Sequence, residues 1–131
     1  ITAGGKNLSP SEIENTMKAS HYIKECIVIG DQRKYISALI MIDFESVSSW
    51  ADENKMSFTT FKSLAENPNV FKLIQEEVDK ANKGLVRVGN VRKFHLLTKE
   101  LDHDDDEMTA TMKIRRAKIY EKYASEINAM Y

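Results

Sequence analysis

Near the end of the chain, two hydroxyl residues and a lysine stand ahead of a basic turn of predicted helix. The residues that could do chemistry are Thr109, Thr111 and Lys113, followed by Arg115 and Arg116. One interpretation is a loop that presents an ammonium group to an anion, with the helix as its support. The alternative is a polar lead-in to a solvated basic face, which composition alone favours. Three cations at a helix N-terminus oppose the helix dipole, and this leans slightly towards an anionic partner.

A second candidate is the segment Thr2–Asn7, in which the adjacent glycines Gly4 and Gly5 precede Lys6. Adjacent glycines let the backbone adopt positive φ and let a ligand pass close to the main chain. An ordinary hairpin turn is the alternative, and the residue types alone favour it. A phosphate-binding P-loop is excluded, because the sequence lacks the second Gly-Lys-Ser/Thr element at the required spacing.

The other reactive residue types are ascribed to the scaffold. The acidic stretch Asp102–Glu107 lacks the residue pattern of a calcium-binding loop, so it is predicted to be a solvated loop tip. The three histidines show no metal-ligand spacing, and we predict no metal site in this chain. Cys26 lies in an apolar run and is expected to be a small core residue. No complete active site is visible in the sequence.

The composition is typical of one globular domain. Of the 131 residues, 42% are hydrophobic, which argues against disorder. The formal net charge of −1 provides no general attraction to nucleic acid or to an anionic membrane. No apolar run approaches the roughly 20 residues that a membrane-spanning helix needs. Because the chain opens with Ile1 rather than methionine, residues 1–131 are interpreted as a single domain cut from a longer protein.

Hydrophobic periodicity predicts an α+β fold. The expected elements are a small N-terminal hairpin, a helix from a capping box at Ser9 and Glu12 to about Ser20, strands at 23–29 and 35–42, helices between 44 and 83, a strand at 91–97, and a final helix from near Ile114 that buries Ile119, Tyr120, Tyr123 and Ile127. The first two strands are apolar throughout, so helices are expected on both of their faces. The predicted architecture is therefore an N-terminal hairpin plus a three-stranded, mostly antiparallel sheet flanked by helices.

Taken in this order, the segments resemble the C-terminal domain of adenylate-forming acyl-CoA synthetases. The resemblance covers essentially the whole chain and rests on ITAGGKNLSPSEIE at residues 1–14, VIGD at 28–31, ALI at 38–40 and EMTATMKIRR at 107–116. The opening ITAGGKN and the helical segment between Met56 and Lys83 resemble the branch of AMP-forming long-chain fatty-acid–CoA ligases. Two positions depart from the common pattern: Met112 stands where many relatives have glycine, and Ala110 where proline is common.

The resemblance implies that one mobile domain serves two half-reactions. In the family, a fatty carboxylate attacks the α-phosphate of ATP, and Lys113 matches the lysine that stabilises the charge that develops. The same motif places Thr109, Thr111 and Arg115 in supporting positions.

The domain then rotates and brings its glycine segment to the site. Gly5, with Gly4 and Lys6 beside it, matches the segment that lines the channel for the pantetheine arm of CoA. A side chain at Gly5 would obstruct that narrow channel, through which the CoA thiolate reaches the acyl-adenylate.

The resemblance also implies a partner and a set of substrates. The partner is the protein's own N-terminal domain, which in the family holds ATP, Mg²⁺ and the acyl chain. The substrates are fatty acid, ATP and CoA. The chain alone is expected to be inactive. A cytoplasmic location is expected, with peripheral association with a membrane left open, and no nucleic acid is expected as a partner.

Three other hypotheses stay open at this point. The chain could be a protein-interaction module without a part in catalysis. It could belong to an acyl-AMP ligase that loads a carrier protein instead of CoA. Acetylation of Lys113 would remove its charge and could regulate the first half-reaction.

Overall fold

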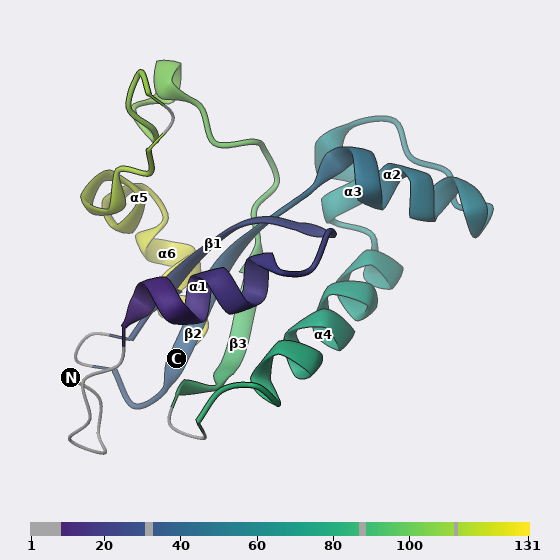
Figure 1. The fold of residues 1–131 in the computed structure, drawn as a ribbon. Helices are drawn as coiled ribbons and strands as arrows, with labels where there is room; N and C mark the ends of the chain where they lie inside the picture. Colours follow the sequence, from purple (N-terminus) through teal and green to yellow (C-terminus); the bar gives the residue numbers. More distant parts are fainter. Residues whose placement is uncertain (1–8, 31–32, 87–88, 112) are drawn as a thin grey trace.

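The computed structural model describes residues 9–30, 33–86, 89–111 and 113–131. A three-stranded sheet lies between two groups of helices (Figure 1). The elements in chain order are α1 (Pro10–Lys18), β1 (Ile23–Ile29), β2 (Ile36–Ile42), α2 (Phe44–Glu53), α3 (Phe61–Ala65), α4 (Pro68–Asn82), β3 (Val91–Leu96), the 3₁₀ turn η2 (His103–Asp105), α5 (Arg116–Lys122) and α6 (Ala124–Ala129). The predicted α+β class is confirmed. Among the described residues, no helix is long and apolar enough to span a bilayer.

The sheet has the order β1-β2-β3 and is mixed. β1 and β2 are antiparallel, with Ile27 opposite Leu39, whereas β3 is parallel to β2, with His95 opposite Leu39. Mostly antiparallel pairing was expected, and it holds for only one of the two strand pairs. The reason is the connection: α2, α3 and α4 form a long crossover that returns the chain in the same direction. The predicted N-terminal hairpin falls on residues 1–8, outside the described residues.

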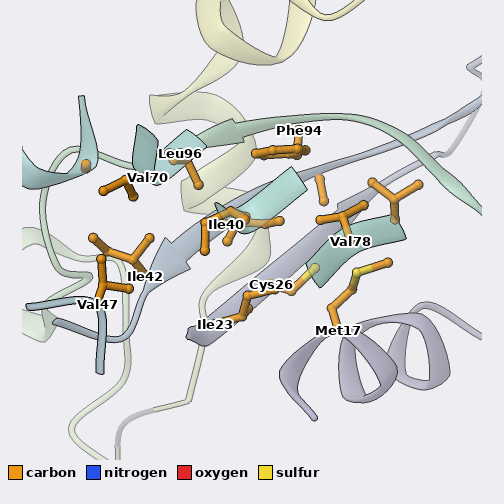
Figure 2. Packing of buried hydrophobic residues seen from close by; sticks show 14 of the residues in the cluster. Met17, Ile23, Cys26, Ile40, Ile42, Val47, Val70, Val78, Phe94 and Leu96 are labelled. Carbon is orange, nitrogen blue, oxygen red and sulfur yellow. The ribbon is translucent and has the colours of Figure 1, made fainter. Parts of the chain in front are cut away.

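Both faces of the sheet are buried, as the uniformly apolar strands predict. One face packs against α1, α2 and α4, in a cluster that includes Cys26 and Ile40 (Figure 2). The other face contributes Ile27 and Leu39 to a second cluster, with Ile119 of α5. A fully buried leucine or isoleucine side chain contributes about 1.5–3 kcal/mol relative to exposure. The sheet is therefore held by apolar burial from both sides.

The two helix starts marked by proline are confirmed. α1 begins at Pro10 with Ser9 as its N-cap, but the Ser9 side chain makes no capping hydrogen bond, so the predicted capping box does not form. α4 begins at Pro68, and the side chain of Asn67 accepts a hydrogen bond from the N–H of Asn69 at 2.8 Å. Proline in the first turn thus marks both starts correctly, because its fixed φ suits that position.

The predicted final helix is two short helices, α5 and α6. α5 begins at Arg116 rather than near Ile114, because Ile114 forms an antiparallel bridge with Met108. Ile119 and Ile127 are buried as predicted. Tyr123 is half-buried. Tyr120 is 39% exposed, against the prediction, and its hydroxyl donates to the Val28 carbonyl at 2.9 Å.

An ion pair joins α1 to α5 across the free edge of β1. The carboxylate of buried Glu14 accepts a hydrogen bond from the N–H of Val28 at 2.9 Å and another from the Arg116 guanidinium. Tyr120 satisfies the carbonyl of the same Val28. These contacts pair main-chain groups of an edge strand that would otherwise be open. They also fix α5 relative to α1.

Replacing Arg116 by alanine is expected to lower the free energy of unfolding of the 131-residue chain by about 2 kcal/mol, because it leaves the Glu14 carboxylate buried without its counter-ion. This decrease in the free energy of unfolding is smaller than for a fully buried ion pair, because the Arg116 side chain is 39% exposed. Urea unfolding measures it. The matched control is Arg115→Ala, which breaks a pair whose side chains are 40% and 69% exposed and should cost at most about 0.5 kcal/mol. Equal losses in the two variants would contradict the role given to the Glu14–Arg116 pair.

Candidate functional site

Residues 107–111 and 113–115, called the lysine loop below, form a hairpin between η2 and α5. Its base is closed by the N–H of Arg115, which donates to the Glu107 carbonyl at 3.0 Å. Met108 and Ile114 form the next bridge. The N–H of Thr109 then donates to the Lys113 carbonyl at 2.7 Å. The backbone on either side of the tip is therefore held by a short antiparallel ladder.

Lys113 is exposed on this ladder. Its N–H donates to the Thr109 hydroxyl at 3.0 Å, and the hydroxyls of Thr109 and Thr111 are 3.0 Å apart. The two threonines thus orient the backbone at Lys113 rather than its ammonium group. Within the described ranges, the ammonium makes no hydrogen bond or ion pair. The geometry exposes a cation on the surface of the domain, which both interpretations of this segment allow.

The root of the lysine loop is anchored in the second apolar cluster. Met108 is buried and Ile114 is half-buried, and both pack in the cluster that contains Leu101 and Ile119. The alternation of buried and exposed residues follows from the ladder, because successive side chains of an extended segment point to opposite sides. Met108 and Ile114 therefore point inward, while the neighbouring Thr109 and Lys113 are exposed.

Glu107, at the base of the loop, is fully buried, which corrects its predicted place in a solvated acidic tip. Its carboxylate accepts hydrogen bonds from the Lys99 ammonium and, at 2.7 Å, from the Tyr123 hydroxyl, and it forms an ion pair with the Lys122 ammonium at 3.0 Å. The N–H of Asp102 also donates to it, at 3.2 Å. Burial opposes the charge, but these donors outweigh it and lower the pKa of Glu107 to about 2. Burial and the bond to Glu107 raise the pKa of Tyr123.

The two arginines of the basic segment serve different contacts. Arg115, predicted as a supporting residue, pairs with Asp106 at 2.8 Å on the surface. Arg116 pairs with Glu14, as described above. The opposition between these cations and the helix dipole is thus relieved by acidic partners within the domain. Of the three predicted cations, Lys113 is the one for which the described residues provide no acidic partner.

Gly4, Gly5 and Lys6 lie outside the described residues, so their predicted role stays a prediction. The helix that follows them, α1, begins at Pro10, and its Glu14 pairs with Arg116, the residue after the lysine loop.

A metal ion has little support in the described part of the chain. Asp102, His103 and Asp104 have ligand atoms within 4.8 Å of one another, but all three side chains are exposed. His103 lies against both carboxylates, 3.3 Å from Asp102 and 3.1 Å from Asp104. Exposed acidic groups of this kind are common without an ion. Cys26 is buried, and burial raises the pKa of its thiol, which suits the predicted core role.

The comparisons with known proteins agree with the resemblance. The family described as AMP-binding enzyme C-terminal domain matches residues 1–131. The chain is 36% identical, over its whole length, to 22% of the long-chain-fatty-acid–CoA ligase FadD15 of Mycobacterium tuberculosis. It is 29% identical to 21% of the human long-chain-fatty-acid–CoA ligase ACSBG1, also over its whole length. The chain thus spans about a fifth of these relatives.

Solved structures share the fold. The adenylation domain of a carboxylate reductase from Mycobacterium chelonae superposes with a TM-score of 0.74, at 22% identity, over 99% of this chain and 19% of that one. A fatty acyl CoA synthetase of Mycobacterium tuberculosis has a TM-score of 0.57 at 19% identity, over 96% of this chain and 20% of that one. At this level of identity, the likeness concerns the fold alone.

Proposed function

Since the chain belongs to the family of AMP-binding enzyme C-terminal domains, we propose that it is the mobile C-terminal domain of a long-chain fatty-acid–CoA ligase. The observation that carries the proposal is Lys113, exposed on a hairpin whose root is anchored in the core. Two of the relatives that match the whole chain are named as long-chain fatty-acid–CoA ligases.

In the proposed first half-reaction, an oxygen of the fatty carboxylate attacks the α-phosphorus of ATP. A new carboxylate–phosphorus bond forms, the bond between the α-phosphorus and the bridging oxygen breaks, and pyrophosphate leaves. Negative charge builds up on the phosphoryl oxygens and the leaving group. The ammonium of Lys113 stabilises this charge without transferring a proton. Thr109 and Thr111 hold the backbone that carries it.

In the proposed second half-reaction, the domain has rotated and Lys113 has left the cleft. The CoA thiolate attacks the acyl carbon and forms the thioester. The bond between the acyl carbon and the phosphate oxygen breaks, and AMP leaves with its electron pair. Gly5, with Gly4 and Lys6 beside it, lines the path of the pantetheine arm. ATP, Mg²⁺ and the acyl chain are assigned to the N-terminal domain, and no residue of this chain is assigned as a Mg²⁺ ligand. A cytoplasmic location is part of the proposal.

Recombining the two parts of the enzyme tests this function. The 131-residue chain and the separately produced N-terminal portion should each be inactive alone. In the intact enzyme, the linker keeps the two domains at a high effective concentration, so the separate parts must be mixed at high concentration. The mixture should then synthesise acyl-CoA from fatty acid, ATP and CoA. The matched control is the Lys113→Ala chain, which should bind the N-terminal portion without restoring activity. If the Lys113→Ala chain restored acyl-CoA synthesis as well as the wild-type chain does, the hypothesis of a protein-interaction module without a part in catalysis would be favoured instead.

The same mixture identifies the acceptor. We propose CoA, and the mixture should therefore form acyl-CoA faster than it acylates a carrier protein at equal concentration. Transfer to the carrier protein alone would contradict this and indicate an acyl-AMP ligase.

A further inference from the structure

We propose that Glu107 is a positioning residue for Lys113: its buried carboxylate fixes the root of the lysine loop and thereby the place of the ammonium group in the adenylation step. This inference rests on the proposed function of Lys113. It assigns a function to a residue that touches no substrate and lies at the opposite end of the hairpin from Lys113.

The Glu107 carboxylate binds polar groups from two segments that are separate in the sequence. Lys99 and the N–H of Asp102 come from the stretch between β3 and η2. Lys122, the last residue of α5, forms an ion pair with the carboxylate at 3.0 Å, and the hydroxyl of the next residue, Tyr123, donates to it at 2.7 Å. Both carboxylate oxygens are used. The group therefore ties the loop to the end of the sheet on one side and to the end of α5 on the other.

The main chain of the same residue closes the hairpin. The Glu107 carbonyl accepts the N–H of Arg115, so the entry and the exit of the loop meet at this point. The ladder then continues through the Met108–Ile114 bridge to the bond between Thr109 and Lys113. A displacement of Glu107 is transmitted along this ladder, because each rung fixes the next. A shift of about 1 Å in a group that must meet a transition state can cost about 100-fold in rate.

Directional bonds explain why a carboxylate stands at this position. Apolar burial is non-directional, and replacing a buried ionic group by apolar side chains is often neutral or stabilising. Three hydrogen-bond donors, together with the Lys122 ammonium, specify both the place and the orientation of the Glu107 carboxylate. The side chains of Lys99 and Lys122 are 39% and 43% exposed, so both can be solvated when the carboxylate is changed. A conservative variant is therefore expected to fold.

The test uses Glu107→Gln in the intact enzyme, which keeps the volume but removes the charge and part of the accepting capacity. We expect the single-turnover rate of acyl-adenylate formation to fall about tenfold. Thioester formation from supplied acyl-adenylate should be unchanged, because it does not use Lys113. The matched control is Glu77→Gln. Glu77 also accepts bonds from a hydroxyl, that of Ser20, and from a lysine, Lys80, but lies in α4. It should leave both rates unchanged.

Combining Glu107→Gln with Lys113→Ala separates positioning from a general structural effect. If Glu107 acts through Lys113, the double variant adenylates at the rate of Lys113→Ala alone. A tenfold further loss in the double variant, an equal loss in both half-reactions, or an unchanged rate in Glu107→Gln would each overturn the inference. Normal adenylation by Lys113→Ala would instead overturn the proposed function itself.

If Glu107→Gln does not fold, Tyr123→Phe provides the test. It removes one hydrogen-bond donor to the Glu107 carboxylate and should slow adenylation without slowing thioester formation. An unchanged adenylation rate, or an equal loss in both half-reactions, would overturn the inference.

Discussion

Replacing Lys113 by alanine in the intact enzyme is expected to slow acyl-adenylate formation by about 100- to 1,000-fold. This is the loss typical of removing one positioned donor that stabilises charge in a transition state. The ammonium is exposed on an anchored hairpin, so its removal should leave the fold unchanged. Single-turnover measurement of pyrophosphate release, with saturating fatty acid and ATP, reports this step.

Two comparisons make the Lys113→Ala result specific. Thioester formation from supplied acyl-adenylate and CoA should proceed at the wild-type rate. Lys118→Ala, which removes an exposed cation of α5 close by in the sequence, should leave both half-reactions unchanged. Adenylation at the normal rate in Lys113→Ala would end the assignment of Lys113 as the catalytic cation.

Replacing Gly5 by leucine is expected to produce the reverse pattern. If Gly5 lines the pantetheine channel as proposed, a leucine side chain there would keep the thiol from the acyl carbon, and a misplacement of about 1 Å already costs about 100-fold. Thioester formation should therefore fall by about 100-fold or more, while pyrophosphate release in the first half-reaction stays at the wild-type rate. Rapid-quench measurement of acyl-CoA from supplied acyl-adenylate tests this.

A second glycine provides the control for Gly5→Leu. At Gly84, which follows α4, an added Cβ would meet the Ala81 carbonyl oxygen at 3.5 Å, an ordinary contact. Gly84→Ala should leave both half-reactions unchanged, and Gly5→Ala should show a smaller loss than Gly5→Leu. A loss of adenylation in Gly5→Leu would contradict the division of the two steps between the two ends of the chain.

Most of the fold is predictable because local signals agree with one another. The apolar runs that became β1 and β2 are hydrophobic on both faces, and both faces are buried. The Pro10 and Pro68 helix starts depend only on neighbouring residues. The exposure of Lys113 also follows from its polar surroundings.

The direction of β3 and the burial of Glu107 depend on contacts between distant segments, which local patterns do not report. A strand such as Val91–Leu96 has the same side-chain periodicity whether it pairs parallel or antiparallel. Glu107 follows a run of five exposed or half-exposed acidic and histidine residues, and its cationic partners, Lys99 and Lys122, lie on either side at different sequence distances. The one local signal is the apolar Met108 next to it, which marks the point where the acidic stretch enters the core.

The central claim is that the Lys113 amine enters a neighbouring catalytic cleft for one step and leaves it for the next. Brief acylation of the intact enzyme by an amine-reactive reagent, followed by mass spectrometry, measures its accessibility directly, with exposed Lys55 as the internal reference. With ATP and an unreactive fatty acid analogue, the modified fraction of Lys113 should fall relative to that of Lys55. With an acyl-adenylate analogue and CoA, it should return to the level of the free enzyme. Equal modification of Lys113 in both states would contradict the account.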